Sequence, residues 1–147
     1  MSTGFKVLRD AVDKGSKKVP ISSQTVLVND LLELTAGATT WAVCTSSSNF
    51  FTRKAIALEA ASSSATEVLV VELDGNEMVE AESVNNSAAA DNGDRMALTD
   101  KNTVNNSGTD VTGQAVVFVQ DGTAGAAADK RIIGRVLVGN GVDPDAA

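Results

Sequence analysis

The stretch Gly93-Asp94-Arg95-Met96-Ala97-Leu98-Thr99 decides the fold, because it has an echo earlier in the chain. Asn29-Asp30-Leu31-Leu32-Glu33-Leu34-Thr35 has the same pattern of a turn residue, an Asp, a short apolar-rich run and a Thr. Each copy is followed, after a polar loop, by two longer apolar runs. The pattern predicts a duplicated β unit, with half-units at about 25–83 and 92–142.

Short β-rich runs separated by turn residues continue along the whole of residues 25–142, which we interpret as one domain. The turn Asp74-Gly75-Asn76 predicts a hairpin between the strands at 67–73 and 77–83. Glutamates recur on one side of the second of these strands, which predicts an exposed edge strand. The sequence therefore predicts an all-β fold, a small β-barrel or sandwich of short antiparallel strands.

Residues 1–24 precede the first unit and read as an extended N-terminal arm. Gly15-Ser16 interrupts the only helical turn, and Val19-Pro20 forces an extended backbone. A disordered tail and an arm that orders on a partner both fit, and the apolar cluster near the start favours the arm. Its candidate partner-binding residues are Phe5, Lys6, Val7, Leu8, Arg9, Lys14, Lys17 and Lys18. Removing residues 1–24 is then expected to leave a folded body that binds its partner more weakly.

Charge is distributed unevenly along the chain. The first 18 residues carry a balance of +3, so the other 129 sum to −10, because the whole chain carries −7. An acidic body argues against binding to nucleic acid. A basic arm on such a body suggests docking onto an acidic protein surface or a neighbouring copy. Residues 143–147 read as a solvated tail.

The residue inventory argues against an enzyme. The chain has no His, which is the commonest general base and metal ligand, and aromatic residues make up only 3%. Cys44 is the only cysteine and is interpreted as a small buried hydrophobe. The Asp-rich segments 91–94 and 100–102 are interpreted as Asx turns rather than a calcium loop. We expect no catalytic residues, no metal and no cofactor.

Targeting signals are also missing from the sequence. No apolar run approaches the about 20 residues of a membrane-spanning helix. The first residues lack the apolar core of a signal peptide, so we expect synthesis in a cytoplasm and no membrane partner.

The second half of the chain carries a family resemblance. Gly93-Asp94 is followed by a polar loop, Ala115-Val116-Val117-Phe118, a Gly/Ala-rich loop and Arg131-Ile132-Ile133-Gly134-Arg135-Val136-Leu137-Val138. This order resembles the small β-barrel head decoration (cement) proteins of tailed bacteriophages. Their pattern is a Gly-Asp strand, a polar loop, an Ile-Gly-Val-Ala-like strand, a small-residue loop and a closing Val-rich strand. Here Ile133-Gly134-Arg135-Val136 lies in the last strand, so the order is shifted.

The resemblance implies a non-enzymatic structural protein on the outer capsid surface of a virion. Such a protein is made in the host cytoplasm, binds the major capsid protein and stabilises the shell as a homotrimer rather than a dimer. No single residue can be carried over as a functional site. The alternative is a tail- or fibre-associated structural module, or a glycan-binding β domain with Trp41 and Phe50-Phe51 lining its surface.

Overall fold

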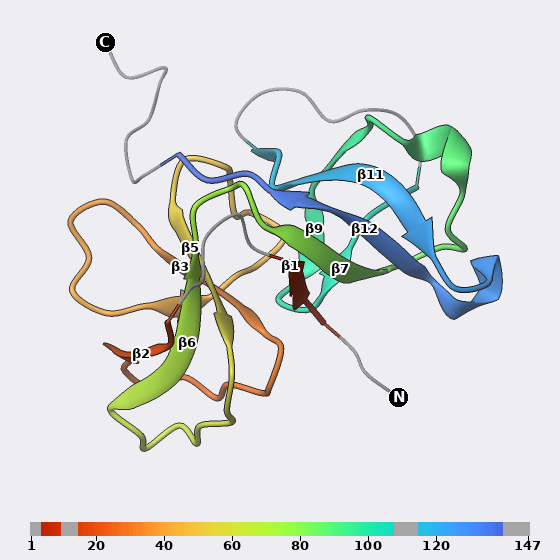
Figure 1. Cartoon of the computed structure of the whole chain (residues 1–147). Coiled ribbons are helices and arrows are strands. Elements are labelled where there is room, and N and C mark those ends of the chain that lie inside the picture. Colours follow the sequence, from red (N-terminus) through yellow and green to blue (C-terminus); the bar gives the residue numbers. More distant parts are fainter. Residues whose placement is uncertain (1–3, 10–14, 108–114, 140–147) are drawn as a thin grey trace, which may run out of the picture.

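The computed structural model describes residues 4–9, 15–107 and 115–139 and has the all-β fold that the sequence predicts. The strands of the described residues form two sheets, which lie side by side in Figure 1. The first sheet has the order β2-β6-β5-β3-β4. Its strands are β2 (Lys17–Pro20), β3 (Leu31–Leu34), β4 (Ala42–Val43), β5 (Arg53–Ala57) and β6 (Glu67–Leu73).

The second sheet closes on itself as a nearly complete barrel. Its order is β8-β11-β12-β7-β10-β9, and β1 pairs with β7 beside this path. Its strands are β1 (Lys6–Arg9), β7 (Met78–Ser83), β8 (Arg95–Met96), β9 (Leu98–Asp100), β10 (Thr103–Val104), β11 (Phe118–Ala124) and β12 (Arg131–Val136). Only Ala97 separates β8 from β9, so the two ends of the order belong to one stretch of chain. The loops contain the short 3-10 helices η1 (Ala89–Asp91) and η3 (Ala127–Asp129).

The first sheet is buried on both faces. Successive side chains of a strand point to opposite faces, so neighbours in sequence enter different cores. Leu31 and Ile56 join the large core that also fills the barrel. Their neighbours Leu32 and Ala55 join a second core on the opposite face. One face of the first sheet therefore supplies part of the packing inside the second.

The two sheets repeat one strand order. In the first sheet β2 pairs with β6, β6 with β5, and β5 with β3, all antiparallel. In the second sheet β7 pairs with β12, β12 with β11, and β11 with β8, again all antiparallel. The echoed stretches are β3 in the first unit and β8–β9 in the second. Each unit also includes the strand that precedes its echoed stretch, so the structural units begin at β2 and β7 rather than at residues 25 and 92.

The turn after β6 connects the two sheets and does not form the expected hairpin. β6 and β7 belong to different sheets, and the buried Glu77 carboxylate holds the turn by accepting the N–H groups of Asp74 at 3.0 Å and Gly75 at 3.1 Å. The expectation of an edge strand was also wrong for β7, which has neighbours on both sides. Its glutamates alternate with buried Val79 and Ala81, so they mark the outer face of the barrel.

The tetrapeptide Val-Asn-Asn-Ser occurs at 84–87 and at 104–107, and the structure places the two copies together. Val84 N–H donates to the Val104 carbonyl at 3.0 Å, which prolongs the parallel pairing of β7 and β10. The Asn106 side chain accepts the Asn85 N–H at 2.8 Å and donates to the Asn85 carbonyl at 3.1 Å. The repeated polar residues therefore close one side of the barrel.

The described part of the N-terminal segment is extended, as predicted, but it lies within the body. β1 pairs with β7, and β2 pairs with β6, so the segment contributes a strand to each sheet. Phe5 is 0% exposed and packs against Phe118, with the ring centroids 6.4 Å apart. Its N–H donates to the Asn29 carbonyl at 2.9 Å. Removing residues 1–24 would therefore disrupt both sheets, contrary to the expectation of a folded body.

Replacing Phe5 by Ala should lower the free energy of unfolding by about 3–5 kcal/mol, because a large buried aromatic group is lost and leaves a cavity. Urea unfolding followed by circular dichroism measures the change. Lys6→Ala is the matched control, since Lys6 is exposed and should change stability by less than about 0.5 kcal/mol. Equal stability of the two variants would show that Phe5 does not belong to the core.

Candidate functional site

The predicted arm residues divide into several groups in the structure. Phe5 is in the core, so the prediction that it contacts a partner is corrected. Val7 packs partly buried against the same core. The exposed residues are Lys6 and Leu8, which remain available to a partner. Arg9 pairs through its backbone with Met78, and Lys14 lies outside the described residues.

Lys17 and Lys18 are engaged by acidic residues of the same chain. Lys17 Nζ lies 2.5 Å from Glu72 Oε1, and Lys18 Nζ lies 3.8 Å from Glu59 Oε1 and 4.0 Å from Glu67 Oε1. These pairs attach β2 to the acidic residues on and beside β6. The positive charges of Lys17 and Lys18 therefore neutralise part of the negative charge of the body.

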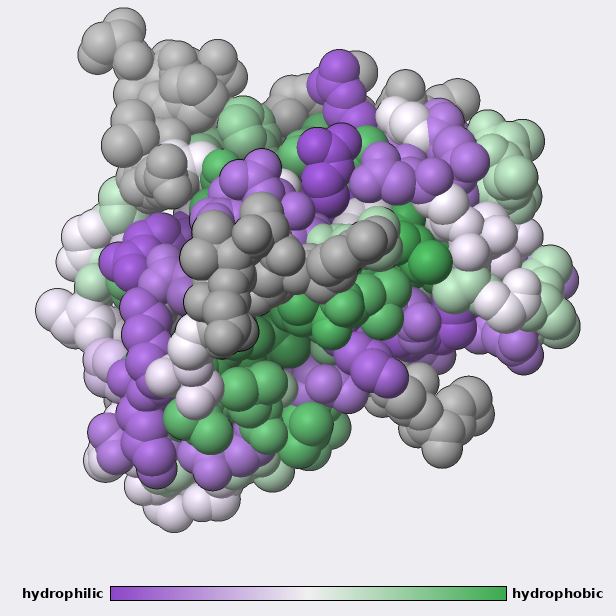
Figure 2. Space-filling model, viewed as in Figure 1, coloured by the Kyte–Doolittle hydropathy of each residue, from purple (hydrophilic) through white to green (hydrophobic). Residues whose placement is uncertain are grey.

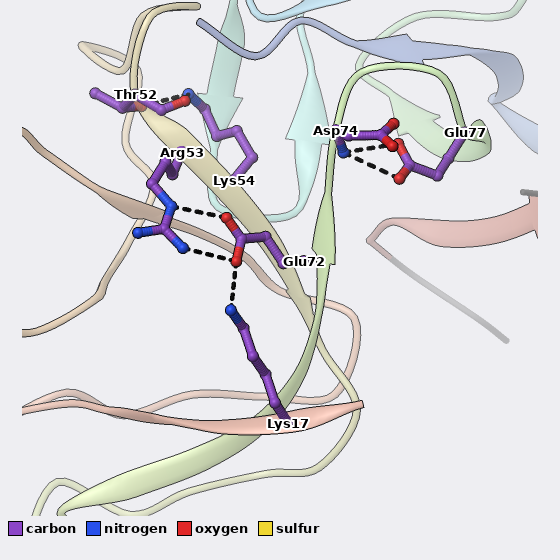
Figure 3. Close-up of polar contacts among 7 residues, drawn as sticks. All are labelled: Lys17, Thr52, Arg53, Lys54, Glu72, Asp74 and Glu77. Atoms are coloured by element: carbon purple, nitrogen blue, oxygen red, sulfur yellow. Dashed lines mark hydrogen bonds and ion pairs between the residues drawn. The ribbon is translucent and has the colours of Figure 1, made fainter. Parts of the chain in front are cut away.

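Glu72 is the centre of a three-residue charge cluster (Figure 3). Arg53 donates to both of its carboxylate oxygens, from Nε at 2.7 Å and from Nη2 at 2.8 Å, and Lys17 donates to one of them. The hydrogen bond from Arg53 is the main reason that the pKa of Glu72 is lowered. Arg53 also lies over the Trp41 ring, 5.4 Å from its centroid. Trp41 is only 3% exposed, so its ring is core and not a platform for a sugar.

A second polar cluster lies under the loop before β5. The Glu33 carboxylate accepts the hydroxyls of Ser48 at 2.6 Å and Thr52 at 2.9 Å. The Thr52 hydroxyl in turn accepts a hydrogen bond from Lys54, whose side chain reaches back along the loop (Figure 3). Cys44 is buried beside this cluster, and burial raises its pKa well above the usual range. The thiol therefore stays protonated, as expected for a packed Cys.

Among the described residues, the most exposed large apolar side chains lie at a turn, where polar residues are the rule. Leu27 and Val28 are each 51% exposed. Asn29 follows with φ of 74°, and Asp30 N–H closes the turn on the Leu27 carbonyl at 3.1 Å. A positive φ at the third position of a β-turn is a conformation that Asn tolerates. The turn thus holds two apolar side chains in solvent at some conformational cost.

Asp30 fixes this apolar turn from beneath. Its side chain is buried, and its Oδ2 accepts the Leu27 N–H at 2.9 Å and lies 3.0 Å from Lys101 Nζ. The Leu31 N–H donates to the Lys101 carbonyl at 2.8 Å. Lys101 lies between β9 and β10, so both sheets hold the turn in place. A buried carboxylate that is paired and hydrogen-bonded makes a rigid support.

Leu58 extends the apolar surface. Asn29 N–H donates to the Ala57 carbonyl and Ala57 N–H to the Asp30 carbonyl, both at 2.9 Å, and Leu58, the next residue, is 43% exposed. We call Leu27, Val28 and Leu58 the apolar surface. In the view of Figure 2, hydrophobic residues gather in a band across the molecule, with hydrophilic residues on both sides. A protein-binding surface has this arrangement, in which apolar residues are surrounded by polar ones.

A shallow apolar groove of about 290 Å³ is lined by Phe50, Arg95, Val116, Val119 and Leu137.

Among the described residues, no group of three or more acidic or Cys side chains is placed to hold a metal ion. Asp100 accepts the Asn102 N–H at 3.0 Å, which is the Asx turn expected there. No helix in the described part of the chain is long and apolar enough to cross a membrane.

Sequence reasoning predicted a turn at Asn29-Asp30 but missed the exposure of Leu27 and Val28 and the Lys54 cluster. Leu27 and Val28 look like the end of a buried strand, since nothing local distinguishes an exposed apolar pair from a buried one. The available signal was Asn29-Asp30 directly after an apolar run, which marks a turn at that point. Lys54 gave no signal, because a lysine in a strand is ordinarily solvated.

Replacing Glu72 by Gln should lower stability at neutral pH and have a smaller effect in acid. A carboxylate whose pKa is lowered by folding stabilises the fold above its unfolded pKa of about 4.3, and this contribution is lost as the pH falls through the folded pKa. Urea unfolding of both proteins at pH 7 and at pH 3 measures the difference. The more exposed Glu67→Gln is the control and should matter little at either pH. An equal loss at both pH values for Glu72→Gln would contradict the role given to its charge.

Comparisons of the chain with protein-family models, with curated proteins and with solved structures find no match. The resemblance to decoration proteins therefore stands on the pattern of turns and apolar runs described above.

Proposed function

We propose that the chain is a non-enzymatic structural protein of a phage virion, which binds the outside of the major capsid shell and stabilises it. The apolar surface is the observation that carries the proposal. A turn held by the pairing of buried Asp30 with partly exposed Lys101 presents Leu27 and Val28 to solvent, each 51% exposed. Free energy spent on keeping apolar groups exposed is recovered when a partner covers them.

The packing of the rest of the body is consistent with a stiff protein that supports a shell. Its polar side chains are largely engaged in holding strands and loops, as in the Glu72 and Glu33 clusters. Each sheet contributes to a shared core, so the two units resist separation. A shell-stabilising protein needs such stiffness because it transmits load between neighbouring subunits.

The apolar surface is too small for strong binding by one copy. Specific interfaces usually bury about 800 Å² on each partner, far more than three side chains supply. Several copies held together gain avidity without new contacts. A homotrimer on the capsid is therefore part of the proposal, and exposed Lys6 and Leu8 are available to extend each contact.

The glycan-binding alternative has less support. It relied on Trp41 and Phe50-Phe51 at the surface, and Trp41 is buried under Arg53. Phe50 and Phe51 pack edge to face, with their centroids 6.0 Å apart, and both are half-buried.

A co-sedimentation assay tests the proposal. We expect a gene for a major capsid protein beside the gene of this chain, and shells assembled from that protein are the probe. The wild-type chain should pellet with the shells. The double variant Leu27→Ser with Val28→Ser should bind about tenfold more weakly or worse, because losing two half-exposed apolar contacts costs roughly 1.4 kcal/mol or more.

Val84→Ser is the matched control, since Val84 is an exposed apolar residue outside the apolar surface. It should pellet like the wild type. Circular dichroism and thermal unfolding check that all three proteins are folded. A wild-type chain that stays in the supernatant would overturn the proposed function. Equal binding by the double variant would instead exclude the apolar surface as the contact.

A further inference from the structure

The two units match residue for residue and not only in strand order. The turns before β3 and β8 show the match directly. Asn29 N–H donates to the Ala57 carbonyl at 2.9 Å, and Gly93 N–H donates to the Gln120 carbonyl at 2.7 Å. Asn29 and Gly93 both have positive φ, of 74° and 89°. The strand registers agree as well, since Leu32 pairs with Ala55 and Ala55 with Glu72, while Met96 pairs with Phe118 and Phe118 with Val136.

This correspondence relates a covered face of the first unit to one face of the second. Leu31, Ile56 and Leu73 lie on the face of the first sheet that packs into the core of the second barrel, and all three are buried. Each is adjacent in sequence to a matched residue, so its counterpart follows from the register. The counterparts in the second unit are Arg95, Val119 and Leu137.

These counterparts line the shallow apolar groove, together with Val116 and with Phe50 of the first unit. Val119 and Leu137 are only partly buried, whereas the residues at the same positions of the first unit are fully packed. In the first unit this face is covered by the barrel that follows it in the chain. The described residues contain no third barrel that could cover the groove in the same way.

The contact inside the chain shows which part of a barrel covers such a face. Leu31 N–H donates to the carbonyl of Lys101, in the turn between β9 and β10 of the second barrel, at 2.8 Å. The first barrel has a turn in the equivalent place, after β3 and before Trp41. Ala38 N–H closes this turn on the Thr35 carbonyl at 3.0 Å. Residues 35–38 are exposed, and Ala-Gly-Ala at 36–38 leaves room for the close approach of another surface.

We propose that the groove of one copy binds the turn 35–38 of a second copy, so that copies associate head to tail. The chain already makes the equivalent contact once, between its own two units, which is the reason for choosing a second copy as the partner. The contact joins two different surfaces and can therefore close into a ring. The inference rests on the proposed function only for the number of copies, because a ring of three is the homotrimer proposed above.

The second unit departs from the first in a way that suits a contact between separate chains. Arg95 replaces Leu31, and Arg135 replaces Val71, by the same register. Arg135 is exposed and its Nε lies 3.2 Å from Asp121 Oδ2. Arginine stems cover apolar surface while their charged ends stay in water, and arginine is enriched at protein interfaces. A single copy thus remains compatible with water, and association should depend on concentration.

Sedimentation equilibrium of the full-length chain, over a range of concentrations and without shells, tests the proposal. The wild type should associate. Val119→Arg should raise the dissociation constant about tenfold or more, because a charge replaces an apolar contact in the groove. Val84→Arg is the matched control, since Val84 is an exposed apolar residue outside the groove, and it should associate like the wild type. Circular dichroism checks that the variants are folded.

A second variant tests the head-to-tail geometry. Ala38→Arg changes the turn at an exposed site, so it should fold normally and also fail to associate. A mixture of Ala38→Arg with Val119→Arg should form dimers, because the first variant keeps an intact groove and the second keeps an intact turn. A contact between two identical surfaces would not be restored by mixing.

A monomeric wild type would overturn the proposal, and so would association of Val119→Arg at wild-type strength or a mixture that stays monomeric. A wild type that associates only after removal of residues 140–147 would show that the chain's own end occupies the groove, which also overturns it. A monomer that still pellets with shells would overturn this contact and leave the shell binding of the chain in place.

Discussion

The core that both sheets share is the constraint on which their arrangement depends, and the packing of Phe5 against Phe118 lies within it. Phe5 belongs to the first described segment of the chain, and Phe118 opens β11 of the barrel. The core around them also contains Leu31 and Ile56 of the first sheet. With few aromatic residues in the chain, these two rings are among the largest fully buried side chains. The barrel core is therefore filled by residues from both units and by the N-terminal segment, whereas the second core, on the opposite face of the first sheet, belongs to the first unit alone.

The sequence was sufficient to predict the class of fold, but it did not predict that the first residues form strands within the body. Alternating apolar residues and turn signals predict strands directly, because both are local properties of the chain. The echo around Asp30 and Asp94 located equivalent strands of two units that share one strand order. The N-terminal strands escaped detection because their partners lie far along the chain. Lys17 looks like part of a solvated basic arm until Glu72 is placed beside it.

The same limit applies to the candidate site. Asn29-Asp30 indicates a turn, yet only the structure shows that Lys101 from the other sheet pairs with Asp30 beneath it. Burial of Lys54 depends on Glu33, Thr52 and the loop between them, and no spacing in the sequence identifies that set. Sequence patterns identify strands and turns, because these depend mainly on residues that are adjacent in the chain. A site assembled from several strands and loops depends also on how those elements pair in the folded protein, which the pattern does not show.

The two unusual features of the first unit differ in what they require of the fold. The apolar turn keeps Leu27 and Val28 in solvent, and the pair of Asp30 with Lys101 holds the turn in place. Covering these side chains would be favourable for any partner that bound there. The Lys54 cluster is enclosed, and the three acceptors of its amine belong to Asn49 and Thr52 of the same chain. Exposure therefore separates a feature that another molecule can cover from one whose contacts are made within the fold.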